Sequence, residues 1–177
     1  MTAVLPAGTP LDAARSEGFT KNFAYISAHG YAMTAPVLTR VGEDGGVRVS
    51  FMLPSSVATP ADGSPQGVVL ESLPARTVAV KPARGASAQP ATWEGLATAA
   101  RALASEAASA QLTLAAPVPP EAPEGDKAKD GVGAAAAVVG PGVWYAGYSS
   151  PMTPPGDKYS EVWLPVAAES AVPGAAP

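Results

Sequence analysis

Few side chains in this 177-residue chain could carry out chemistry. The chain has no cysteine, and His29 is its single histidine. The lack of cysteine excludes disulfides, thiolate nucleophiles, iron–sulfur clusters and cysteine zinc sites, and one histidine cannot supply paired histidine ligands within one chain. Because no G-x-S-x-G motif is present to suggest a serine triad around His29, the sequence does not predict an enzyme.

Charge and hydropathy argue against two classes of partner. The net charge is −4 and the isoelectric point is about 4.9, and no basic stripe of the kind that binds nucleic acid is visible. The stretch GAAAAVVGPGVW is too short and too broken by Gly and Pro to span a bilayer, and MTAVLPAGTP lacks the features of a signal peptide.

We therefore expect a cytoplasmic protein, with a chloroplast or another organelle as the alternative if the N-terminus is truncated. The oligomeric state is not predicted.

The apolar pattern predicts helices and strands that could position the remaining polar side chains. One helix is expected from about Pro10 to Ser27, and a second follows Thr92 and ends near Ala110. The segments 68–72 and 77–81 are expected to pair as a hairpin. The other expected strands cover residues 33–40, 47–53, 143–148 and 161–166.

The order of these elements indicates a βαββ-type unit that is used twice. Such a pseudo-twofold repeat predicts an α+β fold, in which a distorted, antiparallel, barrel-like sheet carries two helices. The domain is expected to cover residues 1–166. A Pro/Ala/Gly-rich stretch at about residues 115–142 is expected to be a mobile insertion, and residues 167–177 a disordered tail.

Three blocks of the sequence resemble the SOUL/heme-binding-protein family. GFTKNFAYISAHGYAMTAPV is similar to the family's first helix and following MTAPV strand, and FMLPSS to its next strand. VWYAGYSSPMTPPGDKYSEVWLPV is similar to its C-terminal signature. The blocks occur in the family's order and cover about residues 2–166, apart from the insertion. Family members begin with one further strand before the segment that matches TAVLPAG, so the first family strand is expected to be missing.

This resemblance implies noncovalent binding of heme or protoporphyrin IX by an intracellular carrier or buffer. Such a ligand needs an apolar cleft for its ring and cations for its propionates. The candidate residues for these roles are Arg15, Phe19, Lys21, Phe23, Ile26, Tyr31, Met33, Tyr145, Tyr148 and Lys158.

His29 is a candidate axial ligand, because histidine commonly binds heme iron. The alternative is a solvated histidine in the loop before the MTAPV strand. Two other functions stay open: a small-molecule sensor on the same fold, and a protein-interaction module that uses the Pro-rich segment APVPPEAP.

Overall fold

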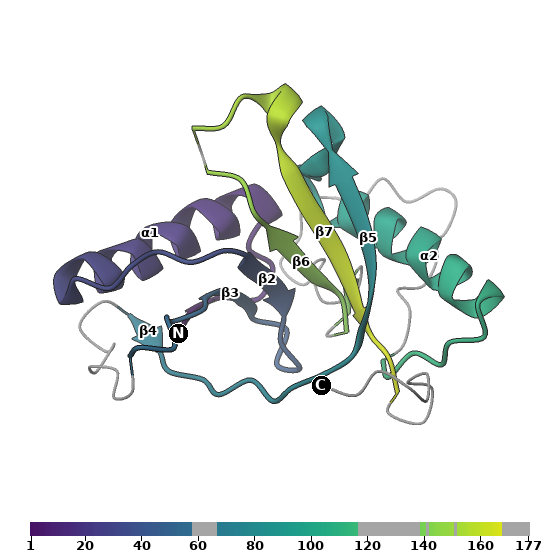
Figure 1. The fold of residues 1–177 in the computed structure, drawn as a ribbon, viewed down its shortest axis with the longest axis horizontal. Helices are drawn as coiled ribbons and strands as arrows, with labels where there is room; N and C mark the ends of the chain where they lie inside the picture. Colours follow the sequence, from purple (N-terminus) through teal and green to yellow (C-terminus); the bar gives the residue numbers. More distant parts are fainter. Residues whose placement is uncertain (58–66, 117–138, 141, 151, 168–177) are drawn as a thin grey trace.

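Seven strands form one antiparallel sheet that carries two helices (Figure 1). The computed structural model describes residues 1–57, 67–116, 139–140, 142–150 and 152–167, except for the side chain of Ser87. The strand order is β4-β1-β3-β2-β6-β7-β5. The strands are β1 (Thr2–Leu5), β2 (Val37–Val41), β3 (Val47–Phe51), β4 (Val68–Val69), β5 (Val78–Arg84), β6 (Trp144–Gly147) and β7 (Tyr159–Pro165), and the helices are α1 (Leu11–His29) and α2 (Trp93–Ser109).

The predicted repeat is visible in the strand pairing. In the first unit, β3 pairs with both β1 and β2, and in the second unit β7 pairs with both β5 and β6. The two units meet where β2 pairs with β6 in the middle of the sheet. The α+β prediction is confirmed, but the sheet is open and not closed into a barrel, because β4 and β5 lie at its two ends.

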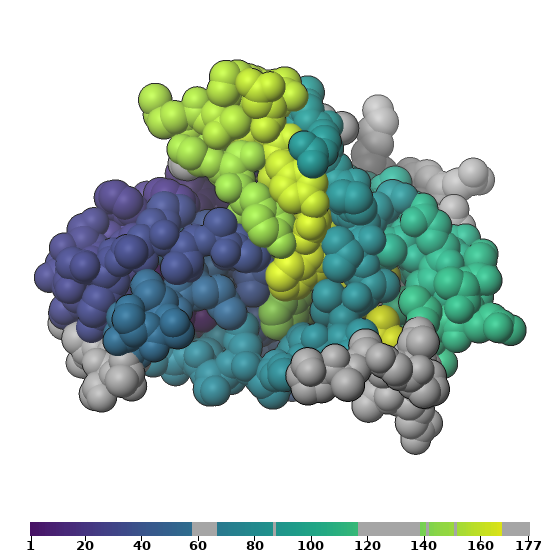
Figure 2. Space-filling view, in the orientation of Figure 1, coloured from purple at the N-terminus to yellow at the C-terminus, as the bar shows by residue number. Residues whose placement is uncertain are grey.

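The predicted hairpin between β4 and β5 is wrong. These strands lie at opposite edges, and the chain between them crosses the sheet face that bears the buried residues Leu38 and Trp144, called the outer face below. Leu73 packs there, and the Arg76 guanidinium lies 4.5 Å from the centre of the Trp144 ring. The connection runs along the lower part of this face (Figure 2). These contacts hold the segment between β4 and β5 against the outer face as it passes from one edge of the sheet to the other.

The helices begin and end close to where the sequence predicts. The Thr92 hydroxyl accepts a hydrogen bond of 3.1 Å from the Gly95 amide and caps α2. Gly30 ends α1 in the left-handed conformation, with φ of 65°, so His29 belongs to the last turn of α1 and not to a loop. The apolar face of α2 is buried as its spacing predicts, through Leu96, Ala100, Leu103 and Ala107.

Strand β2 begins later than predicted. Pairing starts at Val37 and not at Met33, because Pro36 has no amide hydrogen to donate to a neighbouring strand. On β3, the side chains of Val47, Val49 and Phe51 alternate into the core as the sequence predicts.

The predicted insertion and tail lie largely outside the described residues. Where the chain enters and leaves residues 117–138, it is attached to the core: the Ala115 amide donates to the Pro165 carbonyl at 2.8 Å, and Val139 is buried. The domain limits, and the expectation that the first family strand is missing, stay predictions.

Candidate functional site

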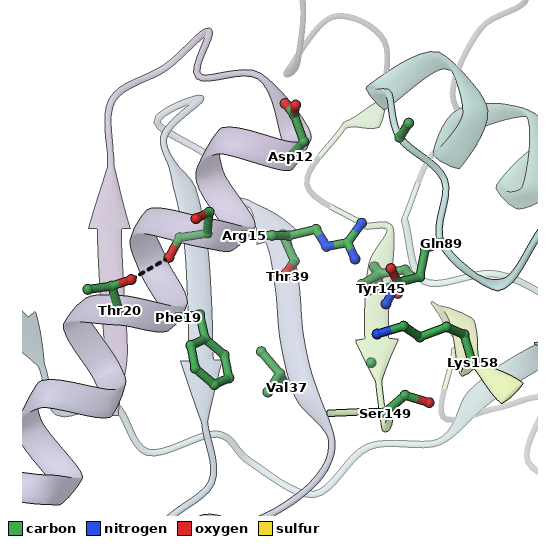
Figure 3. A pocket seen from close by; sticks show the side chains of 13 residues that line it. Asp12, Arg15, Phe19, Thr20, Val37, Thr39, Gln89, Tyr145, Ser149 and Lys158 are labelled. Atoms are coloured by element: carbon green, nitrogen blue, oxygen red, sulfur yellow. Dashed lines mark hydrogen bonds between the residues drawn. The ribbon is translucent and has the colours of Figure 1, made fainter. Parts of the chain in front are cut away.

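A cavity of about 640 Å³ lies between α1 and the centre of the sheet. It opens where the two βαββ units meet, beside the β2–β6 pair. Arg15, Gln89, Tyr145 and Lys158 approach one another at one end, while Phe19 and Val37 lie at the other (Figure 3). The residues that line the cavity are Asp12, Arg15, Ser16, Phe19, Thr20, Val37, Thr39, Gln89, Ala91, Tyr145, Gly147, Ser149 and Lys158.

The floor of the cavity is formed by two directly paired residues, Thr39 on β2 and Tyr145 on β6. Both side chains are buried. The Tyr145 hydroxyl donates a hydrogen bond to the Ala88 carbonyl at 3.3 Å. Within the part of the chain that the structure describes, the Thr39 hydroxyl has no hydrogen-bond partner. The floor is therefore closed by buried side chains, and the enclosed Thr39 hydroxyl contributes no accessible surface to the cavity.

Two cations face this cavity. The Arg15 guanidinium lies 4.8 Å from the centre of the Tyr145 ring and donates to the Pro90 carbonyl at 3.2 Å. The Lys158 ammonium donates to the Ser150 carbonyl at 2.7 Å, and the side chain is buried. Asp12 is the one carboxylate among the lining residues. The lining is therefore net positive in a chain whose net charge is −4, which favours an anionic ligand.

The apolar end of the cavity is built by aromatic packing. The Phe19 ring contacts the edge of Phe51, with centroids 5.2 Å apart, and stacks on Phe23 at 5.8 Å. Phe19 itself lines the cavity together with Val37. Stacked, partly buried rings of this kind offer a surface for a flat apolar ligand.

Four of the ten predicted binding residues line the cavity: Arg15, Phe19, Tyr145 and Lys158. The other six lie elsewhere. Lys21 pairs with Glu17 at 2.8 Å, and Ile26 is buried in the core. Phe23 and Met33 are exposed outside the cavity, Tyr31 packs on a second core cluster, and Tyr148 bonds to Glu161.

His29 also lies away from the cavity. It is exposed in the last turn of α1, where its ring lies 4.8 Å from that of Tyr25 and 5.6 Å from that of Tyr31. Thr20 is the last lining residue on α1, and the helical rise places His29 roughly 14 Å further along the axis. The described residues contain no group of three or more His, Asp or Glu side chains that could hold a metal ion.

Two lining residues, Thr39 and Gln89, are not among the residues predicted from the sequence. A signal for Thr39 was present in the segment VLTRV. Val37 and Thr39 are two residues apart on a strand and so share a face, which makes Thr39 a polar residue on the buried face. Gln89 has no comparable signal, because it follows a short 3₁₀ helix (Gly85–Ala88) that the sequence does not predict.

A second polar cluster lies on the outer face, around Glu161. Its carboxylate accepts hydrogen bonds from the Tyr148 hydroxyl at 2.8 Å, the Tyr159 hydroxyl at 2.5 Å and the Trp163 indole at 2.7 Å. Burial acts to raise the pKa of Glu161, but the three hydrogen bonds together outweigh it and hold that pKa below its ordinary value of 4.5. Burial and the bond to Glu161 raise the pKa of Tyr148 to about 12.

We expect this cluster to make stability depend on pH at both extremes. The lowered pKa of Glu161 means that its contribution is complete above about pH 4.5 and is lost as the pH falls through the folded value. The raised pKa of Tyr148 means that its contribution is complete below about pH 10 and is lost as the pH rises through about 12. Glu161→Gln should therefore flatten the acid side of the curve of melting temperature against pH. An unchanged acid side would contradict this assignment.

Comparison with known proteins identifies the family. Residues 2–165 match the family described as SOUL heme-binding protein, so the chain belongs to that family. No curated protein sequence matches the chain at a significant level. None of the helices in the described ranges is long and apolar enough to cross a membrane.

Proposed function

We propose that the chain binds a tetrapyrrole, either heme or protoporphyrin IX, noncovalently in the cavity between α1 and the β2–β6 pair. The observation that carries the proposal is the combination of an apolar wall and two cations in one cavity of a member of a heme-binding family. The volume, about 640 Å³, lies within the range of roughly 300–1,000 Å³ typical of cofactor sites. The protein would act as a carrier or buffer, and no residue is proposed to catalyse a reaction.

The lining residues fit a ring that is held by burial and by its propionates. Phe19, Val37 and Tyr145 would contact the macrocycle, and Arg15 and Lys158 would pair with the propionates. Bound heme would supply a redox-active iron, and protoporphyrin IX would supply the ring alone. The described lining contains no histidine or methionine. The proposal therefore requires no axial side chain, and the two ligands should bind alike.

Titration with hemin and with protoporphyrin IX tests this function. Absorbance and tryptophan fluorescence would follow binding, and competition between the two ligands would show whether they share one site. Saturable one-to-one binding of both is expected. If neither binds saturably, the carrier function is wrong for this chain, and a sensor of another small molecule becomes the better hypothesis.

Replacement of His29 by alanine should change hemin affinity by less than about twofold. The reason is the position of His29, which is exposed and distant from the cavity. If His29 bound the heme iron, removal of the imidazole would break that bond and abolish the absorbance band that the bond produces. A large loss of hemin binding, with protoporphyrin IX binding unchanged, would show that His29 is an iron ligand.

A further inference from the structure

The central strands present two paired steps to the cavity, and the steps differ in how open they are. Thr39 pairs with Tyr145 and Val37 pairs with Gly147, and all four residues line the cavity. Thr39 is 0% exposed and Tyr145 is 3% exposed, whereas Val37 and Gly147 are partly exposed. A ligand that enters the cavity therefore meets the sheet at the Val37–Gly147 pair.

Gly147 is a residue that the fold alone does not explain. Glycine weakens a strand, because it loses much conformational freedom on folding and has no side chain to pack. Its φ is not positive, so other residues can adopt the same backbone conformation. The three atoms nearest to a Cβ at this position lie 3.3 to 3.8 Å away and all belong to the Tyr145 side chain. No neighbouring backbone is among them, so alanine would require only a small shift of that ring.

A side chain at position 147 would enter the cavity. Residues two apart on a strand share a face, so position 147 shares the inner face of the sheet with Tyr145. Phe19 on α1 and Val37 on β2 lie at the same end of the cavity (Figure 3). The missing side chain therefore leaves space between α1 and the sheet, and this space has apolar walls. A glycine within a strand often marks a place where a ligand comes close to the backbone.

We propose that Gly147 is the specificity-determining residue that admits the face of the tetrapyrrole ring. The macrocycle would lie against the Val37–Gly147 pair, and Phe19 would contact it from α1. This inference rests on the proposed function and adds to it the residue that sets how large a ligand the cavity accepts. The selection acts on the ring and is independent of the charged groups of the ligand.

The size limit follows from the rigidity of the surrounding walls. The Phe19 ring is fixed by its contacts with Phe51 at 5.2 Å and with Phe23 at 5.8 Å, and Phe51 is buried. A well-packed wall withdraws little when a neighbouring side chain grows. Each carbon added at position 147 would therefore take space from the ring, and the cavity would accept only smaller ligands.

A series of side chains of increasing size at position 147 tests the inference. Gly147→Ala should weaken protoporphyrin IX binding less than about threefold, Gly147→Val about tenfold and Gly147→Leu about 100-fold, as expected when methyl groups are forced into a filled space. Fluorescence titration measures the affinities. The melting temperatures of the ligand-free variants should stay close to that of the unmodified chain, because the added groups extend into the cavity and not into the packed core.

Gly156→Leu is the matched control. Gly156 lies in the short 3₁₀ helix before β7 (Pro155–Asp157), where a Cβ would meet nothing within 4 Å, and it does not line the cavity. We expect less than a twofold change in affinity. Unchanged affinity in Gly147→Leu, or a loss in Gly147→Ala as large as in Gly147→Leu, would overturn the inference and leave the proposed function intact. The absence of saturable binding to the unmodified chain would overturn both.

A thiol at the same position tests the contact without filling the cavity. The chain has no cysteine, so Gly147→Cys introduces a single thiol. Protoporphyrin IX, which has no iron to bind sulfur, should slow the reaction of this thiol with a maleimide at least about tenfold, because the ring covers it. The thiol of Gly156→Cys should react equally fast with and without the ligand. Equal rates for Gly147→Cys with and without saturating protoporphyrin IX would overturn the contact.

Discussion

Replacement of Arg15 by glutamine is expected to weaken protoporphyrin IX binding about 10- to 100-fold. The guanidinium is held in place by the Tyr145 ring, 4.8 Å away, and by the Pro90 carbonyl, 3.2 Å away, so little ordering is needed when a carboxylate binds. A hydrogen bond to a charged group contributes about 1.5–3 kcal/mol, and each 1.4 kcal/mol corresponds to roughly tenfold in affinity. Fluorescence titration of the two proteins measures the difference.

Lys21→Gln is the matched control for this experiment. It removes the same charge from the same helix, but Lys21 pairs with Glu17 at 2.8 Å and does not line the cavity. We expect less than a twofold change in affinity. If both variants lose affinity equally, the general charge of α1 attracts the ligand and the cavity does not position it. Melting temperatures of both variants would show whether either loss reflects unfolding.

Gly18→Ala is expected to destabilise the fold by about 1–3 kcal/mol. Alanine is normally favoured over glycine in a helix by about 1 kcal/mol. At Gly18, however, a Cβ atom would lie 2.5 Å from both the Cβ and the Cγ2 of Val49 on β3, and these atoms lie next to the backbone and cannot move far. The melting temperature should fall by roughly 3–10 °C, which calorimetry can measure.

Two comparisons isolate this close contact between α1 and β3. Gly95→Ala is the helical control, because the nearest atoms to its new Cβ lie 3.3 and 3.5 Å away, and we expect a change of less than about 1 kcal/mol. The double variant Gly18→Ala/Val49→Gly should be more stable than the sum of the two single changes predicts, because Val49→Gly removes both atoms that the new Cβ would meet at 2.5 Å. Additive losses would show that the contact with Val49 is not the cause.

The types of most elements follow from local sequence. The alternation of Val47, Val49 and Phe51 predicts β3, and the spacing of Leu96, Ala100 and Leu103 predicts the buried side of α2. Both patterns depend only on the repeat of the strand or helix itself. The repeated order of strands and helices also predicts the two βαββ units correctly.

The partners of the strands do not follow from local sequence. The segments on either side of LPAR have the spacing of a hairpin, yet β4 and β5 lie at opposite edges of the sheet. Leu73 packs on the outer face and Arg76 stacks on Trp144, which belongs to a strand much later in the chain. Contacts of this range decide where β5 pairs, and no window of sequence contains them.

The same limit explains the uneven prediction of the candidate site. Phe19, Phe23 and Ile26 follow the predicted helical spacing, but they lie in three different environments. Phe19 lines the cavity, Phe23 is exposed to solvent, and Ile26 is buried in the core. Thr39 becomes a floor residue only because β2 pairs with β6 and places it opposite Tyr145. Motif resemblance selects residues near a site, whereas strand register decides which of them share a surface.

The pairing of β2 with β6 also bears on how this chain can acquire its structure during synthesis. Arg40 on β2 is paired with Trp144 on β6, so the centre of the sheet forms between segments that are far apart in the chain. Contacts of such long range fold slowly, because a large loop must close before they form. Until β6 has been synthesised, β1, β2 and β3 can pair with one another but leave one edge of β2 open, and an open strand edge is a template for pairing with other chains. The edge of β2 that pairs with β6 at the floor of the cavity is thus also an edge at which the incomplete polypeptide can pair with other chains.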